Sequence, residues 1–319
     1  MENGEEKEIG LTRIHMEEDA GKSIHDVDVF DTLVDLNRAG VPLLEVVSEP
    51  DIRSSQEAYT YLTEVRKLVR YLEICDGNME EGSLRCDANI SVRIKGSPEF
   101  GTKIEVKNMN SMRNVQRAID FEIERQIMAI ENGETIVSET RSFDALNGTT
   151  ISMRSKEAAN DYRFFPEPDL QPLVIDQKQI DTIKAEMPAL PRDLFLKYTN
   201  ELGLSAYDAY NLTDIKEIAL YFEEVIKSTK NYKAAANWMM GDIKSYLNHN
   251  GIEIGDFPIS PEKIAQLIEV ISSGKISSTI ASQKVFPEML KNHNNTPLEI
   301  AESNNLIQDS NEDSILTFI

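Results

Sequence analysis

The chain has 319 residues, of which 40% are hydrophobic and 28% are charged, and its net charge at pH 7 is −22. This composition is typical of a globular protein with two or three domains, and the acidic balance argues against broad non-specific binding to a polyanion. Its two cysteines form neither a disulfide framework nor a zinc set, and its acidic start has no apolar signal segment, so we expect a cytoplasmic protein.

Residues 1–175 mix strand and helix patterns. Apolar and polar residues alternate over residues 11–17, 84–94 and 103–107, which predicts strands. Helical periodicity predicts one helix over residues 54–73, begun by a capping box, and another over residues 111–131. Long antiparallel strands with helices on one side make an α+β domain.

Residues 176–319 carry helical patterns only, which predicts an all-α domain. A joint between two helical parts is expected near residues 250–258, where glycine and proline cluster. Trp238 lies within a helical pattern, which favours a core position over a stacking platform. The predicted helices cover residues 178–187, 191–202, 213–228, 231–249, 260–273, 277–291 and 296–304.

Two of the predicted strands have a polar face. Residues 85, 87, 89, 91 and 93 share one face of the first strand, and Lys103, Glu105 and Lys107 share one face of the second. The helix start at residues 108–111 follows directly and offers free N–H groups to an anion. These features indicate a concave phosphate site, and the alternative is a sheet face that water covers.

Two further segments carry candidate ligands. His15 and Glu17 lie on one side of the first predicted strand, and such a pair can bind one divalent metal. Residues 153–169 are dense in Arg, Lys and acidic residues, which suits either a transferred phosphoryl group or a surface lattice of ion pairs.

Six long runs carry a characteristic order of residues. They cover residues 13–22, 35–51, 76–91, 102–108, 139–144 and 153–170. Together they closely resemble the GatB family, the B subunits of bacterial aspartyl/glutamyl-tRNA amidotransferases. The resemblance is dense over residues 9–173 and looser around residues 237–240 and 274–290.

The resemblance implies a cradle domain like that of glutamine synthetase, followed by the helical domain. It implies ATP- and Mg²⁺-dependent phosphorylation of the side-chain carboxylate of Glu-tRNA(Gln) or Asp-tRNA(Asn). Ammonia from the glutaminase, which is the A subunit, then displaces phosphate, and a small C subunit holds the other two together. The alternative is a non-catalytic tRNA-binding or assembly subunit that has kept the fold.

Site residues follow from the resemblance combined with strand alternation. We expect Glu17, Glu105, Arg85 and Lys107 to act in catalysis. The expected metal ligands are His15, Glu17, Glu81 and Glu105, and the expected nucleotide-phosphate contacts are Arg85, Lys107, Arg154 and Arg163.

The chain departs from the family pattern at both ends. Nothing in it corresponds to the family's amino-terminal stretch, which carries a Glu and a His near the metal, or to its carboxy-terminal tail domain. We therefore expect residues 1–175 to form the carboxy-terminal part of the cradle, and this chain to be inactive alone. A sheet that lacks strands would also have an unpaired edge.

Overall fold

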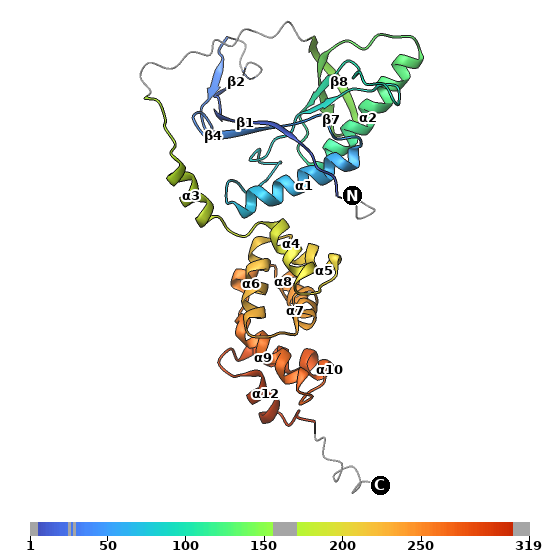
Figure 1. The fold of residues 1–319 in the computed structure, drawn as a ribbon. Helices are drawn as coiled ribbons and strands as arrows, with labels where there is room; N and C mark the ends of the chain where they lie inside the picture. The colour runs from blue at the N-terminus through green and yellow to red at the C-terminus, as the bar shows by residue number, and fades with distance from the viewer. Residues whose placement is uncertain (1–5, 25–26, 28–29, 156–170, 309–319) are drawn as a thin grey trace. The chain divides into compact units, whose positions relative to one another are not determined.

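A computed structural model describes residues 6–24, 27, 30–155 and 171–308, without the side chains of residues 154 and 155. The chain divides into two compact units (Figure 1). Unit 1 comprises residues 1–65 and 78–165, and unit 2 comprises residues 66–77 and 166–319. Among the described helices, none has the length and apolar composition needed to cross a membrane.

Unit 1 begins with a two-stranded antiparallel sheet of β1 (Leu11–Glu18) and β4 (Pro42–Ser48). Strand β1 is where alternation predicts it. Strand β4 is not among the strands that the sequence predicts. A proline is tolerated here because it is the first residue of the strand. Strands β2 (Lys22–Ile24) and β3 (Leu33–Asp35) form a second antiparallel pair.

A four-stranded sheet forms the centre of unit 1, in the order β5-β6-β7-β8. The expectation of long antiparallel strands is wrong here. The strands are short, and β6 and β7 are parallel because the helix α2 (Met112–Glu131) connects them. The bounds are β5 (Ala88–Ile90), β6 (Ile104–Lys107), β7 (Glu139–Asp144) and β8 (Thr149–Ser155).

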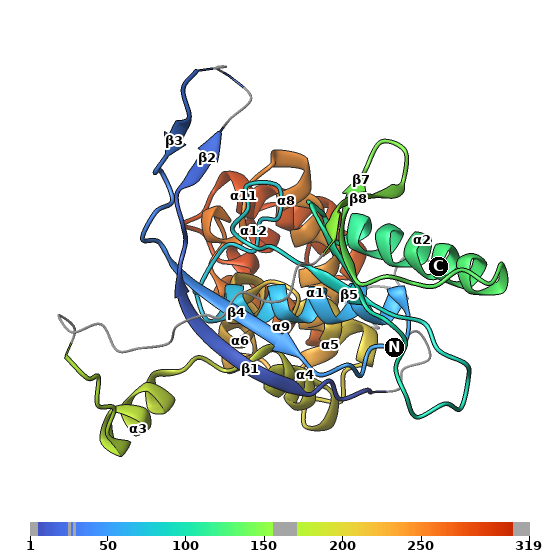
Figure 2. The ribbon, with the colours of Figure 1, turned by 90° about the horizontal axis from the view of Figure 1, so that it is seen from above.

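Helices cover one face of this sheet. Ile104 and Val106 of β6 are fully buried and belong to one apolar cluster with Val115 of α2. Leu62 of α1 (Ser55–Tyr71) belongs to the same cluster, and Figure 2 shows α2 lying beside β7 and β8. The opposite face of the sheet therefore carries the alternate, polar residues of β6.

The N-cap of α2 agrees with the sequence, and that of α1 agrees in part. Ser111 accepts a hydrogen bond from the backbone N–H of Asn114, as an N-cap does. At the start of α1, Ser54 accepts from the N–H of Glu57, but the Glu57 carboxylate accepts from the N–H of Arg53. The expected capping box is thus only half formed.

Among the described residues of unit 2 the regular elements are all helices, as the pattern predicts. All seven predicted helical segments are present. Helix α5, capped by Ser205, is an addition that the sequence did not predict. From residue 177 on, the elements of unit 2 are α3 (Gln177–Glu186), α4 (Pro191–Asn200), α5 (Ala206–Leu212), α6 (Lys216–Lys227), α7 (Tyr232–Trp238), η1 (Met239–Ile243), α8 (Lys244–Asn250), η2 (Ile254–Asp256), α9 (Pro261–Ser272), α10 (Ser278–Ile280), η3 (Ala281–Val285), α11 (Phe286–Lys291) and α12 (Pro297–Ser303).

One apolar cluster fills unit 2. Tyr198 and Phe222, both fully buried, meet edge to face with ring centroids 5.0 Å apart. Phe257 lies within the expected joint at residues 250–258 and packs against Tyr221 before it and Phe286 after it. The helices on either side of that segment therefore share one core.

Candidate functional site

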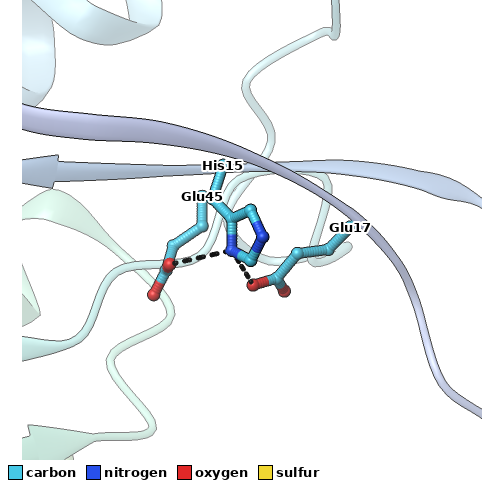
Figure 3. A group of neighbouring side chains, drawn as sticks. All are labelled: His15, Glu17 and Glu45. Carbon is cyan, nitrogen blue, oxygen red and sulfur yellow. Dashed lines mark ion pairs between the residues drawn. The ribbon is translucent and has the colours of Figure 1, made fainter. Parts of the chain in front are cut away.

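Three side chains of β1 and β4 form a group with metal-ligand geometry (Figure 3). His15 and Glu45 are cross-strand partners, and Glu17 follows His15 on the same face of β1. The Nδ1 atom of His15 lies 3.2 Å from a carboxylate oxygen of Glu17 and 4.0 Å from one of Glu45. One ligand atom from each of the three residues lies within 4.8 Å of the others.

The chemistry of this group suits a divalent cation. Two carboxylates offer the hard oxygen ligands that Mg²⁺ prefers, and the imidazole adds a nitrogen donor. All three side chains are about half exposed, so water can complete the coordination shell. Arg13 contacts the Glu45 carboxylate at 3.0 Å. That ion pair lowers the negative charge of the group. It would have to break if Glu45 bound a metal ion with both carboxylate oxygens.

A second polar group lies on β6, on the sheet face opposite α2. Glu105 accepts a hydrogen bond of 2.9 Å from Thr140 of β7, and its other oxygen lies 3.7 Å from Nζ of Lys107. Lys107 also pairs with Asp87. Burial by itself would lower the pKa of Lys107, but the hydrogen bond and charge of Asp87, with Glu105, raise it overall. Lys107 therefore keeps its positive charge beside Glu105.

The expected phosphate contact Arg85 is engaged elsewhere in unit 1. Its guanidinium pairs with Asp19, just beyond the end of β1, and Arg38 hydrogen-bonds to the same carboxylate at 2.8 Å. The hydrogen bond from Arg38 lowers the pKa of Asp19 below its ordinary value, and the charge and hydrogen bond of Arg85 lower it further. One side chain thus binds two guanidiniums. The Arg85 side chain nevertheless remains half exposed, so a ligand can still reach it.

The other expected site residues are not brought into these groups. Glu81 is exposed in the loop after α1, where its backbone N–H bonds to Asn78, and it does not belong to the His15 group. Glu105 does not belong to that group either. The backbone of Arg154 pairs with Thr140, but its side chain is not described, and Arg163 lies outside the described residues.

Sequence reasoning missed several partners. Glu45 is the clearest case, because recognising β4 as a strand would have placed Glu45 on one of its two faces. Asp87 is on the predicted polar face but was not singled out as the partner of Lys107. No sequence signal could have paired Asp19 with Arg85, since they lie 66 residues apart in the chain.

Two family matches cover most of this chain. Residues 1–181 match the family described as the GatB/GatE catalytic domain, and residues 220–319 match the family described as the GatB domain. The chain belongs to the GatB family. The first match spans all three groups described above, so the candidate site lies within the family's catalytic domain.

Curated relatives agree with this assignment. The chain is 53% identical over 307 residues to the B subunit of the aspartyl/glutamyl-tRNA(Asn/Gln) amidotransferase of Gloeothece citriformis, covering 95% of this chain and 62% of that protein. The B subunits of the same name from Pelodictyon phaeoclathratiforme and Trichodesmium erythraeum are 51% and 50% identical, with 98% and 99% of this chain and 65% of each relative covered. The chain thus spans less than two thirds of the length of these GatB relatives.

Proposed function

We propose that this chain acts as the B subunit of a tRNA-dependent amidotransferase. The reaction transfers the γ-phosphoryl group of ATP to the side-chain carboxylate of Glu-tRNA(Gln) or Asp-tRNA(Asn), releasing ADP. Ammonia then attacks the acyl phosphate, the C–O bond to phosphate breaks, and the amide forms with loss of a proton. The observation that carries this proposal is the pair of charged groups on β1, β4 and β6 within the catalytic-domain match.

The side chains of unit 1 have separate tasks in this scheme. His15, Glu17 and Glu45 hold a divalent cation. Glu105, oriented by Thr140, is placed to bind a second cation or a water attached to it, and Lys107 beside it contacts a phosphate oxygen. Magnesium, when bound, offsets the negative charge of the ATP phosphates and orients them.

The arginines are assigned by charge. Arg85 is anchored by Asp19 and half exposed, so it can contact a phosphate oxygen without a large ordering cost. Arg154 and Arg163 keep the same assignment as a prediction, on sequence grounds alone. Glu81 is the weakest of the proposed metal ligands. Like Glu105 it belongs to no group of three candidate ligands among the described residues, and it lies exposed in the loop after α1, whereas Glu105 is held by Thr140.

The wider architecture follows the same proposal. We assign residues 1–175 to a glutamine synthetase-like cradle and residues 176–319 to a helical domain. The partners are a glutaminase, the A subunit, which supplies ammonia, together with a small C subunit and the two mischarged tRNAs. A cytoplasmic location stays a prediction from the sequence.

The experiment that tests this function uses the amidotransferase assembled with its A and C subunits. Glu105→Gln should abolish ATP- and tRNA-dependent amide formation, because the neutral amide cannot offset the charge of a cation. Glutamine hydrolysis by the glutaminase should continue. Glu124→Gln, an exposed change on α2, is the matched control and should leave both activities intact.

Two results would contradict the proposal. Full amide formation by Glu105→Gln would remove Glu105 from the site. Failure of the assembled wild-type complex to bind Mg·ATP would favour the alternative of a non-catalytic tRNA-binding or assembly subunit, since such a protein needs no nucleotide.

A further inference from the structure

Unit 2 contains a groove of about 450 Å³ lined by residues of α7, η1, α9, α10 and η3. This volume lies within the range of roughly 300–1,000 Å³ that is usual for small-ligand pockets. The groove follows the helix that α7 and η1 form, because it is lined both by Asn231, the N-cap of α7, and by Asp242 of η1. Eleven helical steps separate these two residues by roughly 15 Å. A ligand that fills the groove is therefore long.

Part of the lining of this groove is apolar. Ala234 of α7 lies between Asn231 and Asp242 along the helix, and Ile268 and Ile271 of α9 also line the groove. Apolar side chains at these positions favour a ligand with an apolar stretch, because contact removes both surfaces from water.

The only charge in the described lining of the groove is one carboxylate. Asp242 is partly buried and accepts a hydrogen bond from the Ser282 hydroxyl. It forms no ion pair with another residue in the described part of the chain, and no lysine, arginine or histidine is among the described residues of the lining. Asp208 of α5, by contrast, is paired with Lys233. A partly buried carboxylate without a cation favours a ligand that brings positive charge.

Two π-helical turns meet at this carboxylate, because Asp242 belongs to η1 and Ser282 to η3. Such turns are rare and occur frequently at functional sites. Pro287 has no N–H to offer the carbonyl of Gln283, which accounts for the irregularity at η3. The residues of η1 include no proline, so the same cause does not act there.

Neutral hydrogen-bond acceptors complete the lining. Ser278, Thr279 and Gln283 line the groove, and their side chains form no hydrogen bond with another described residue. Ser272 accepts a hydrogen bond of 3.1 Å from Asn231, and its hydroxyl oxygen has a second lone pair. These oxygens can accept hydrogen bonds from further N–H groups of a ligand.

We propose that this groove binds a linear aliphatic polyamine, a molecule in which methylene chains join several ammonium groups. A terminal ammonium group pairs with Asp242, and the methylene chain lies against Ala234 and Ile271. The other ammonium groups donate to the hydroxyl and amide oxygens of the lining. The inference is independent of the proposed function, since the groove includes none of the charged groups of unit 1.

Isothermal titration of the full chain with spermidine tests this site. Asp242→Asn, which preserves the shape of the side chain, should weaken spermidine binding at least about tenfold. Ala234→Leu should also weaken it, because the larger side chain fills the groove while the charge stays the same. Asp256→Asn is the matched control, since Asp256 is exposed on η2 and does not line the groove, and this variant should bind spermidine as wild type does.

The control separates a specific site from general attraction, because a net charge of −22 attracts any polycation. Equal losses of affinity in Asp242→Asn and Asp256→Asn would overturn the inference, and so would wild-type affinity in Ala234→Leu or the absence of spermidine binding. Tighter binding of Nα-acetyl-lysine than of spermidine would overturn it as well, because the groove would then suit a lysine of a partner protein.

Discussion

Glu17 and Glu18 are neighbours in β1 but lie on opposite faces of the strand. Glu17 lies with His15 and Glu45, whereas Glu18 is paired with Pro42. The two residues have the same charge and are both exposed, so their comparison isolates the metal group from the general acidity of the sheet.

At this scale we predict that Glu17→Gln weakens Mn²⁺ binding by at least about 10-fold, the lower limit for loss of a supporting residue at a metal site. Glu18→Gln should leave the affinity unchanged. Isothermal titration of both variants with Mn²⁺ measures the difference. Equal losses in the two variants would mean that the sheet attracts cations only through its overall charge.

Asp208 illustrates how a buried carboxylate depends on its partners in unit 2. Its burial would raise its pKa, but the hydrogen bonds from Lys233 and from Ser205 hold the pKa below the ordinary value of 3.8. Because the folded-state pKa is depressed, the stabilisation is present above that value and is lost as pH falls through the lower, folded-state pKa.

Asp208→Asn should therefore lower the free energy of unfolding at neutral pH, by on the order of 1 kcal/mol. The difference from wild type should vanish well below pH 3.8. Thermal unfolding at the two pH values measures this, with the exposed Asp256→Asn as control. A deficit that persists in acid would point to a packing effect instead of a charge effect.

At the scale of elements, α2 is joined to the sheet of unit 1 by a buried ionic network. Glu122 is fully buried, accepts a hydrogen bond of 2.9 Å from Thr150 of β8, and lies 3.6 Å from Arg141 of β7. Arg125, one turn along the helix, binds the same carboxylate. One side chain of α2 thus links two strands that follow it in sequence.

Removal of this carboxylate leaves Arg141 without its partner in α2. We predict that Glu122→Ala destabilises unit 1 by about 1–3 kcal/mol, because Thr150 loses its buried acceptor while Arg141 keeps its ion pair with Glu139. Chemical denaturation followed by circular dichroism tests this. The exposed Glu124→Ala on the same helix should cost little. A small loss in Glu122→Ala would mean that water replaces the carboxylate.

At the scale of the whole molecule, two separate apolar clusters support two units. Phe222 is fully buried in the cluster of unit 2, and Val115 is almost fully buried in that of unit 1. Each cluster is large enough to form a domain core. A cavity made in one core should therefore destabilise mainly the unit that contains that core.

Phe222→Ala should lower the stability of unit 2 by about 3–5 kcal/mol, and Phe222→Leu, which keeps more of the volume, by much less. Hydrogen exchange resolved by segment measures where the effect falls. Protection should decrease in α4, α6 and α9 and remain unchanged in α2. Loss of protection in α2 as well would show that the two units unfold as one.

The sequence by itself determined most of the helices, the N-cap of α2 and the polar face of β6, because each depends on periodicity or on residues close together in the chain. Helix α5 and the second half of the expected capping box at α1 were not determined in this way. The family resemblance was also available from sequence, since it rests on long local motifs. The limit is visible in residues 84–94, predicted as one strand. Only Ala88–Ile90 pairs with β6, and Ile94, expected on the apolar face, is 84% exposed.

Only the tertiary structure decided which segments lie together. Alternation tells which face of a strand a residue occupies but not which strand lies beside it, so Glu45 could not be joined to His15 until β4 paired with β1. For the same reason the contacts of the buried Glu122 were not predicted. Its partners Thr150 and Arg141 come from strands that follow α2 in the chain, and the choice among such partners is made by packing the whole unit.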